Sequence, residues 1–381
     1  MRILHVTDAA SAGVLTAVTT LARAQAAHPD IERVVLGYVP RPDSPTPAGI
    51  AELTGPAVEV RRWHRGGRTA IAGLTGRLWS TLGREGFDIV HLHSSRAGFL
   101  GRPVAALRGH RDRTVYSPHC FAFDRSDFGA GPRAVYRALE RIGARAGDRL
   151  VLVSESEAEV ARRAIPGVRT AVLRNSVDVA ALQRTVGRTP GETAEVPAPA
   201  ADRNGEDGPP LVVHIGRIQG QKQPEQFAAV ARRVRAALGP VRFRWLGDGD
   251  RARLGDGIEV SGWMPHAVLV AELARADAVL FTSAGEGMPM SVLEAQTLGV
   301  PVIASDVTGL RDIVDDGVTG RLVTGEVALA AALIEVLSDP ALRSRLGAAA
   351  AARARAAFDA ADLADRSLTA YRSLAAGERT P

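Results

Sequence analysis

The stretch Leu211-Val-Val-His-Ile215-Gly216-Arg217 is followed, from Pro224, by apolar side chains at helical spacing. The five largely apolar residues predict a buried strand, the glycine permits a tight turn, and the spacing predicts a helix over 224–238. A strand, a turn and a helix in this order form the unit of a doubly wound α/β sheet. Further strands are predicted at 242–246, 278–281 and 300–304.

The same alternation fills the first half, with strands predicted at 3–7, 33–37, 88–93, 114–117 and 150–154 and helices at about 14–27 and 133–146. A length of 381 residues exceeds what one hydrophobic core usually organises. We therefore expect Rossmann-like domains at 1–187 and 211–359, joined by a Pro-, Ala-, Gly- and acid-rich linker at 188–210. The tail from about Pro340 is expected to form one or two surface helices.

The formal net charge of +5 is small for this length, and nearly all of the positive charge is arginine. Lys222 is the single lysine, which makes it a residue to explain. The chain starts directly with a strand and has no apolar run of the roughly 18 residues that span a bilayer, so we expect a cytoplasmic protein. Cys120 is the single cysteine, which excludes an intrachain disulfide and a cysteine-rich zinc site.

Two cations follow the strand at 211–215. Arg217 and Lys222 lie five residues apart at the start of a helix, so both can face one anion. The planar fork of arginine and the compact charge of lysine suit a diphosphate. The alternative is a pair of solvated surface cations.

Another constellation follows the strand at 278–281: Ser283-Ala-Gly-Glu286-Gly-Met-Pro289-Met-Ser-Val-Leu-Glu294. Pro289 suits the first turn of a helix, which would place the amides of Gly287 and Met288 near a positive dipole end, where phosphate oxygens bind. Glu286 and Glu294 could accept hydrogen bonds from a sugar and a ribose. The alternative is an acidic helix start with an ordinary exposed Glu294.

These motifs resemble the retaining GT-B glycosyltransferases of family GT4, which carry a Gly-Arg, a Lys and two Glu separated by seven residues. The resemblance extends over most of the chain. Further segments are similar, in order, to landmarks of the family: Asp88-Ile-Val-His91-Leu-His93, Ser117-Pro-His119-Cys-Phe121, Leu152-Val-Ser154-Glu155, Asn175-Ser-Val-Asp178, Gly262-Trp-Met-Pro265 and Gly299-Val-Pro-Val302.

The resemblance implies a GT-B fold, in which two Rossmann-like domains face a central cleft and a C-terminal helix, within 360–381, crosses back to the first domain. It also implies retaining transfer of a hexose-type sugar from a UDP- or GDP-linked donor. The acceptor would be a hydroxyl of a polysaccharide, a glycolipid or a small molecule. The nucleotide sugar is a co-substrate, and neither a cofactor nor a metal is expected.

The resemblance also implies roles for individual residues. Glu294 would bind the ribose and Glu286 the hydroxyls of the transferred sugar, while His119 would lie near the reacting sugar. The base would meet mainly backbone groups at Trp263 and Met264. The diphosphate would be bound by Gly13, Arg217, Lys222, Gly287 and Met288.

Two positions depart from the family. Cys120 replaces a glycine that commonly follows the histidine, and Ser176 replaces the glycine of an Asn-Gly-Val-Asp turn. A nucleophilic pair of His119 and Cys120 is disfavoured, because adjacent side chains on an extended segment point to opposite faces. We therefore expect Cys120 to serve packing.

Metal sites are considered at His91 with His93, at Asp248 with Asp250, and at Asp124 with Asp127. No third ligand is evident beside the two histidines, so neutral histidines of the core or cleft are favoured. A site that already carries Arg217 and Lys222 needs no cation to neutralise a diphosphate.

Rival functions remain. A GT-B phosphorylase is disfavoured, because Lys222 is the single lysine that could hold pyridoxal phosphate. A nucleotide-sugar epimerase would share the fold. A non-catalytic protein could instead bind nucleic acid through its arginines. A peripheral membrane contact is a further hypothesis, opposed by an ordinary amphipathic helix that packs its leucines inward. The stripe in question is Ile71, Leu74, Leu78 and Leu82, surrounded by Arg61, Arg62, Trp63, Arg65, Arg68, Arg77, Trp79 and Arg84.

Overall fold

The computed structural model describes residues 1–63, 70–187 and 208–376. The described chain divides into two compact units. The N-terminal unit comprises 1–176 and the chain from 360 on, and the C-terminal unit comprises 177–359. Most of the predicted linker, 188–207, lies outside the described residues.

The N-terminal unit is built on a seven-stranded parallel sheet in the order β3-β2-β1-β4-β5-β6-β7. Its first strand lies between β2 and β4, so the strand order reverses beside β1, where ligands bind in open α/β sheets. The strands are β1 (Arg2–Thr7), β2 (Arg33–Tyr38), β3 (Val58–Arg62), β4 (Ile89–His93), β5 (Thr114–Ser117), β6 (Arg149–Leu152) and β7 (Arg169–Val172).

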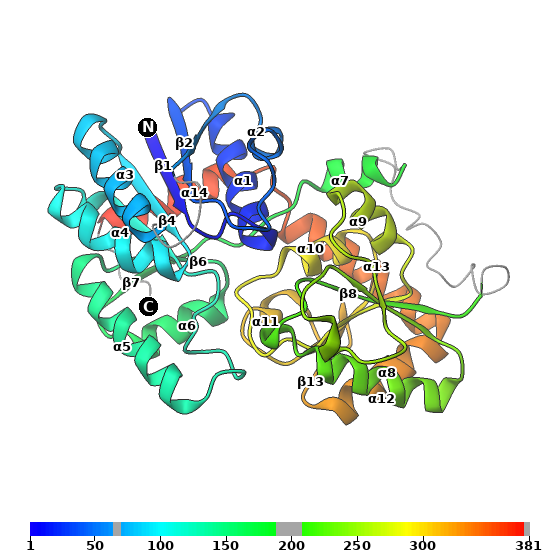
Figure 1. Ribbon diagram of the computed structural model, residues 1–381. Helices are drawn as coiled ribbons and strands as arrows, with labels where there is room; N and C mark the ends of the chain where they lie inside the picture. Colours follow the sequence, from blue (N-terminus) through cyan, green and yellow to red (C-terminus); the bar gives the residue numbers. More distant parts are fainter. Residues whose placement is uncertain (64–69, 188–207, 377–381) are drawn as a thin grey trace. The chain divides into compact units, whose positions relative to one another are not determined.

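Helices cover both faces of this sheet (Figure 1). Alternate residues of β1 enter different cores: Ile3 packs with Val18 of α1, and Leu4 with Leu78 of α3. A sheet buried on both faces explains why its strands are apolar runs. The helices are α1 (Ala12–Ala26), α2 (Pro47–Thr54), α3 (Ala70–Arg84), α4 (Ser95–Leu107), α5 (Ala130–Ala146), α6 (Glu155–Ala164) and α14 (Leu363–Ala376).

The last helix, α14, returns to the unit in which the chain begins. Leu368, Tyr371 and Leu374 are buried in the same core as Ile3 and Val18. Figure 1 shows the red α14 behind the blue strands and helices of this unit. The C-terminal helix is therefore part of the N-terminal unit, as the resemblance implied.

The C-terminal unit has a six-stranded parallel sheet in the order β10-β9-β8-β11-β12-β13. The order reverses beside β8, just as it does beside β1. The strands are β8 (Leu211–Ile215), β9 (Arg242–Leu246), β10 (Glu259–Val260), β11 (Ala278–Phe281), β12 (Val302–Ser305) and β13 (Gly320–Val323). The helices are α7 (Val179–Thr185), α8 (Pro224–Leu238), α9 (His266–Ala274), α10 (Met290–Thr297), α11 (Leu310–Ile313), α12 (Glu326–Ser338) and α13 (Pro340–Ala357).

The chain enters the C-terminal unit at Val177, ten residues before the predicted end of the first domain. The amide of Val177 donates to the carbonyl of Phe358 at 2.9 Å. Asp178 then caps α7 by accepting from the amide of Ala181 at 2.8 Å. Helix α7 therefore groups with the second unit. The backbone at Ser176 does not adopt a positive φ, so this turn does not require the glycine of the family.

The stripe on α3 is part of the core. Leu74, Leu78 and Leu82 are buried, and Trp63 is buried beside them. Arg65 and Arg68 lie outside the described residues, and Arg61 forms ion pairs with Glu85 and Glu59. The three leucines therefore pack inward, as the alternative held, while the side chain of Ile71 lies outside the described part of the chain. No helix among the described residues is long and apolar enough to cross a membrane.

Candidate active site

The loops that follow β8 and β11 are joined by hydrogen bonds. The amide of Ala284 donates to the carbonyl of Gln221 at 2.8 Å, and the side chain of Gln221 donates to the carbonyl of Gly285 at 2.9 Å. The hydroxyl of Thr282 donates to the carbonyl of Lys222 at 2.8 Å. Two segments about sixty residues apart in sequence therefore form one hydrogen-bonded surface at the carboxyl ends of neighbouring strands.

This arrangement brings Lys222 against Glu286. The Nζ of Lys222 lies 2.7 Å from Oε1 of Glu286 and 4.6 Å from the centre of the Phe281 ring. The two side chains are 14% and 8% exposed. The predicted ligand of the diphosphate and the predicted ligand of the sugar thus form a mostly buried ion pair.

Two glycines allow this packing. A Cβ at Gly216, whose φ is +147°, would lie 3.1 Å from Cε of Lys222. A Cβ at Gly309, whose φ is +79°, would lie 2.1 Å from the carbonyl oxygen of Gly287. No side chain fits that second position. No sequence motif points to Gly309, because its partner is a backbone atom of the loop that carries Gly287.

Helix α10 carries the second glutamate. Pro289 caps the helix, which begins at Met290, so Gly287 and Met288 directly precede its N-terminus. Glu294 is 5% exposed, which rules out the alternative of an ordinary exposed residue. Its Oε1 lies 2.8 Å from Nε2 of His266, at the start of α9, and this hydrogen bond raises the pKa of His266. His266 was not among the residues predicted from the sequence.

Ser283 is a further residue that sequence analysis did not assign. It is 1% exposed and stands directly between the bonded Thr282 and Ala284. Among the hydrogen bonds of the described residues, its buried Oγ has no partner. A buried hydroxyl without a partner is rare in proteins, and a ligand oxygen at this loop would satisfy it.

The other predicted donor residues lie in the same unit. Arg217 is half-buried directly after Gly216. Trp263 and Met264 follow β10, and Trp263 is 54% exposed. Gly262 pairs with Gly247, which places this loop at the carboxyl end of β9. The structure thus gathers these residues at one end of the sheet, while their ligands stay predictions.

Gly13 belongs to the N-terminal unit. It lies within the first turn of α1 rather than in the preceding loop, because the helix begins at Ala12. Gly13 is exposed, and a Cβ built there would meet no atom within 4 Å. The space beside Gly13 is therefore open, as close approach of a ligand to its backbone would require.

The segment after β5 is not extended, contrary to the expectation from sequence. His119 has a φ of +57° and Cys120 a φ of +116°, both in the left-handed region that favours glycine. The amide of Cys120 donates to Oε1 of Glu157 at 2.7 Å, and the amide of Val153 donates to the other oxygen at 3.0 Å. Cys120 is half-buried, and its role in packing stays a prediction.

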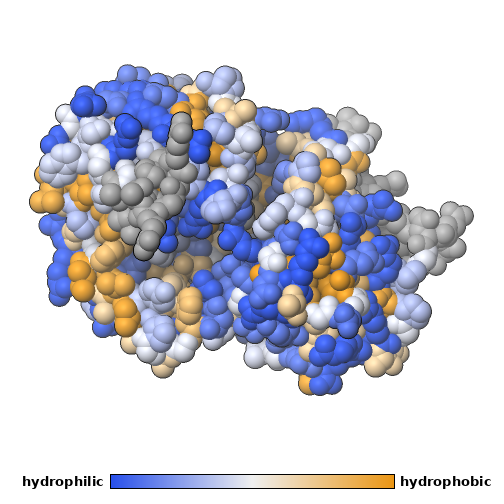
Figure 2. Space-filling model, viewed as in Figure 1, coloured by the Kyte–Doolittle hydropathy of each residue, from blue (hydrophilic) through white to orange (hydrophobic). Residues whose placement is uncertain are grey.

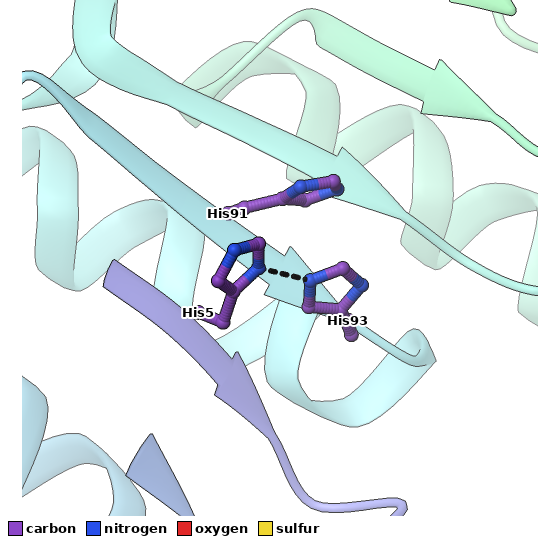
Figure 3. A group of neighbouring side chains, drawn as sticks. All are labelled: His5, His91 and His93. Carbon is purple, nitrogen blue, oxygen red and sulfur yellow. Dashed lines mark hydrogen bonds between the residues drawn. The ribbon is translucent and has the colours of Figure 1, made fainter. Parts of the chain in front are cut away.

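A third histidine, His5 of β1, joins His91 and His93 of β4 (Figure 3). Their ligand atoms lie within 4.8 Å of one another, so the expectation that no third ligand exists was wrong. Each ring nitrogen of the three is, however, within hydrogen-bonding distance of a protein group. Burial lowers the pKa of each, to about 4 for His5, so the rings are neutral at pH 7.

In each acidic pair that was considered as a metal site, one aspartate forms an ion pair with an arginine. Asp248 accepts from Arg251 at 2.8 Å, and Asp127 accepts from Arg125 at 2.6 Å. The hydrogen bond from Arg251 lowers the pKa of Asp248 to about 2. Among the described residues, these acids do not belong to any group of three or more that could hold a metal.

Comparison with known proteins identifies the family. Residues 11–181 match the family described as Glycosyltransferase Family 4, and residues 209–339 match Glycosyl transferases group 1. The 2-deoxystreptamine N-acetyl-D-glucosaminyltransferase of Streptomyces fradiae is 30% identical over 356 residues, which cover 86% of this chain and 79% of the relative. The UDP-Gal:alpha-D-GlcNAc-diphosphoundecaprenol alpha-1,3-galactosyltransferase of Escherichia coli is 28% identical over 261 residues, 65% of each chain.

Solved structures show the same fold. The sucrose-phosphate synthase of Thermosynechococcus elongatus superposes with a TM-score of 0.79 at 20% identity, over 99% of this chain and 100% of that chain. Anabaena HepE in complex with UDP and glucose superposes with a TM-score of 0.74 at 18% identity, over 98% and 100%. The chain therefore belongs to the GT4 family of glycosyltransferases with a GT-B fold.

Proposed function

We propose that this enzyme transfers a hexose-type sugar from a UDP-linked donor to a hydroxyl of a carbohydrate or cyclitol acceptor, with retention of configuration. The ion pair between Lys222 and Glu286 carries the proposal, because it holds a cation for a diphosphate beside an acceptor for sugar hydroxyls. UDP is favoured over GDP because the E. coli relative uses UDP-Gal and HepE is in complex with UDP.

In this proposal, the groups around the ion pair divide between the parts of the donor. Lys222, Arg217 and the amides of Gly287 and Met288 stabilise the diphosphate, and Ser283 donates its unpaired hydroxyl to a phosphate oxygen. Glu294 accepts from the ribose, and Glu286 accepts from the sugar. Trp263 and Met264 receive the base.

The reaction then exchanges one bond for another on the same face of the sugar. The bond from C1 to the phosphate oxygen breaks while the acceptor oxygen bonds to C1. The proton of the acceptor passes to the leaving phosphate oxygen, so no protein nucleophile takes part. The negative charge on UDP grows in this step, and the fixed cations and amides stabilise it without a metal or another cofactor.

A panel of nucleotide sugars tests the donor. We expect UDP-hexoses to bind and to be consumed only when an acceptor is present, with the anomeric configuration kept in the product by NMR. EDTA should leave the rate unchanged. Formation of an epimerised nucleotide sugar without acceptor would instead identify an epimerase, and a salt-sensitive nucleic-acid shift without turnover would identify a binding protein.

A panel of acceptors tests the second substrate. The S. fradiae relative is named for 2-deoxystreptamine and the E. coli relative for a GlcNAc-diphosphoundecaprenol, so both classes belong in the panel. We propose the soluble cyclitol class first, because the S. fradiae relative aligns with 86% of this chain against 65% for the E. coli relative. Transfer to the lipid-linked acceptor alone would contradict this order.

We propose α5 as the surface for a peripheral membrane contact. Val135 and Ile142 are 58% and 52% exposed on α5, and the neighbouring Arg137 and Arg141 are exposed as well. Figure 2 shows orange hydrophobic residues among blue ones on this side of the N-terminal unit. Flotation with anionic liposomes at low salt tests this contact. Equal recovery of the wild type and of Val135→Ser/Ile142→Ser would contradict it.

A further inference from the structure

A chain of hydrogen bonds links Gln25 of α1 to His119 through two buried histidines. Oε1 of Gln25 lies 2.7 Å from Nε2 of His5, and Nδ1 of His5 lies 2.9 Å from Nε2 of His93. Nδ1 of His93 lies 3.0 Å from Nε2 of His119. A neutral imidazole has one N–H and one lone pair, so every link must point in the same direction along the chain.

The side-chain amide of Gln25 sets that direction. Its nitrogen lies 2.9 Å from Oγ of Ser367 and 3.1 Å from the hydroxyl oxygen of Tyr371, both on α14. The hydroxyl of Ser367 donates its one proton to the carbonyl of Ala364 at 2.7 Å. Ser367 can therefore only accept from Gln25, which requires the nitrogen of the amide, not its oxygen, to face α14.

A second branch of the network, through His91, requires the same orientation of the Gln25 amide. The hydroxyl of Ser117 donates its one proton to the carbonyl of Val151, so it must accept from Nε2 of His91, 2.7 Å away. Nδ1 of His91 is then unprotonated and accepts from the hydroxyl of Tyr371 at 2.9 Å. The oxygen of Tyr371 consequently accepts from Gln25. Two separate backbone carbonyls thus fix one orientation of Gln25.

The orientation of Gln25 determines each tautomer along the chain. Its Oε1 accepts from Nε2–H of His5, Nδ1 of His5 accepts from Nε2–H of His93, and Nδ1 of His93 accepts from Nε2–H of His119. Nδ1 of His119 therefore carries a lone pair. It has no hydrogen-bond partner among the described residues, and His119 is partly exposed.

We propose that Gln25, His5 and His93 are positioning residues that hold His119 in its Nε2–H tautomer, so that Nδ1 accepts a hydrogen bond from a substrate hydroxyl. This inference rests on the proposed sugar transfer for the nature of the ligand. The protein alone determines the tautomer. An uncharged acceptor suits a hydroxyl, whereas an N–H at the same point would leave the hydroxyl without an acceptor for its proton.

A metal ion is the competing use of the histidine cluster. Binding an ion to His5, His91 and His93 would require at least one hydrogen bond at each ring to break, because both nitrogens of each ring are already within hydrogen-bonding distance of a protein group. Each of the six ring nitrogens of these histidines donates or accepts one hydrogen bond within the protein, so none needs an ion as a partner. The fully paired network therefore favours positioning over metal binding.

Long-range ¹H–¹⁵N spectra of histidine-labelled protein at pH 7 report each tautomer directly. We expect His5, His91, His93 and His119 all to be neutral with the proton on Nε2, with signals assigned through single His→Gln variants. A proton on Nδ1 of His119 in the wild type would overturn the proposal. So would a stoichiometric metal that His5→Gln removes.

Paired variants test the role of Gln25. Gln25→Leu removes the acceptor of His5 and should give mixed tautomers at His5, His93 and His119. Tyr371→Phe is the matched control, because Gln25 keeps its bonds to His5 and Ser367. It should leave the tautomer of His119 unchanged. Unchanged tautomers in folded Gln25→Leu would overturn the proposal.

Kinetics complete the test. Loss of one hydrogen bond to the substrate predicts a kcat/KM about 2- to 10-fold lower in Gln25→Leu than in Tyr371→Phe, with equal affinity for UDP. Equal kcat/KM in the two variants would overturn the link to the substrate. The tautomers remain measurable if no UDP-sugar is turned over, so failure of the proposed function is distinguishable from failure of the positioning chain.

Discussion

Replacing Lys222 by methionine tests whether one ammonium group serves two partners. The sequence alone predicts that the fold is unaffected, because a solvent-lined cation contributes little to stability. The structure predicts otherwise, since the Glu286 side chain is 8% exposed and would lose the cation that lies 2.7 Å away. Breaking a fully buried pair costs about 3–5 kcal/mol, and with partial exposure we expect a loss of about 1–3 kcal/mol in the free energy of unfolding.

Donor binding separates the two roles of the lysine. A hydrogen bond to a charged group is worth about 1.5–3 kcal/mol, so Lys222→Met should weaken UDP binding about 10- to 150-fold. Glu286→Gln keeps the ammonium and releases it from the ion pair, so UDP should bind equally well or more tightly. The same variant should transfer sugar more slowly, because the sugar loses a charged acceptor. Lys222→Arg should recover only part of the affinity.

Urea unfolding and calorimetric titration with UDP measure both effects on the wild type, the two single variants and the double variant. The cycle should show a coupling energy between the two residues in unfolding. Wild-type UDP affinity in folded Lys222→Met, together with no coupling, would refute the reasoning. Lys222 would then be a surface residue with no part in donor binding.

Three further predictions concern single positions. Cys120→Gly should raise the free energy of unfolding by about 1 kcal/mol in urea, because a φ of +116° strains a residue with a Cβ; a lower value would contradict this strain. Gly309→Ala should lower the free energy of unfolding and the affinity for UDP more than the control Gly317→Ala does. Gly317 also has a positive φ, but the space around it is open. Equal effects of the two substitutions would exclude the contact with Gly287. His266→Ala should lower the melting temperature more at pH 6 than at pH 9, because a raised pKa places the stabilising charged form below that pKa; a pH-independent difference would contradict the ion pair.

The sequence predicted the central strands closely and the edge strands poorly. The bounds of β8, β9 and β11 agree with the predicted ranges. Strands β8 and β11 are largely apolar, and β9 alternates arginine with buried aromatic residues before Gly247. Strand β3, Val58–Arg62, was missed because an edge strand carries polar residues. Strand β7 was missed because it has four residues and only a short apolar signal.

In the candidate site, the sequence predicted the positions of residues but not their contacts. The sequence placed Lys222 and Glu286 after the correct strands, since the loop positions follow from the β-α order. It could not show that the two side chains pair, because that contact depends on the register of β8 and β11. His5 was overlooked for the same reason, because only the pairing of β1 with β4 sets it opposite His91. The backbone at Cys120 was mispredicted because a sequence of non-glycine residues suggests extended chain.

In both units the candidate residues lie near the point where the strand order reverses, beside β1 and beside β8. The candidate residues of the two units differ in charge. The C-terminal unit pairs Lys222 with Glu286 and holds His266 against Glu294, whose hydrogen bond raises the pKa of the histidine. The N-terminal unit buries the ring nitrogens of a histidine cluster, and burial lowers the pKa of His5, His91, His93 and His119, to about 4 for His119. Charged groups suit a diphosphate that gains charge as it leaves, and a neutral acceptor suits a hydroxyl. In the proposed reaction, the same doubly wound architecture would supply an electrostatic site in one unit and a site of directional hydrogen bonds in the other.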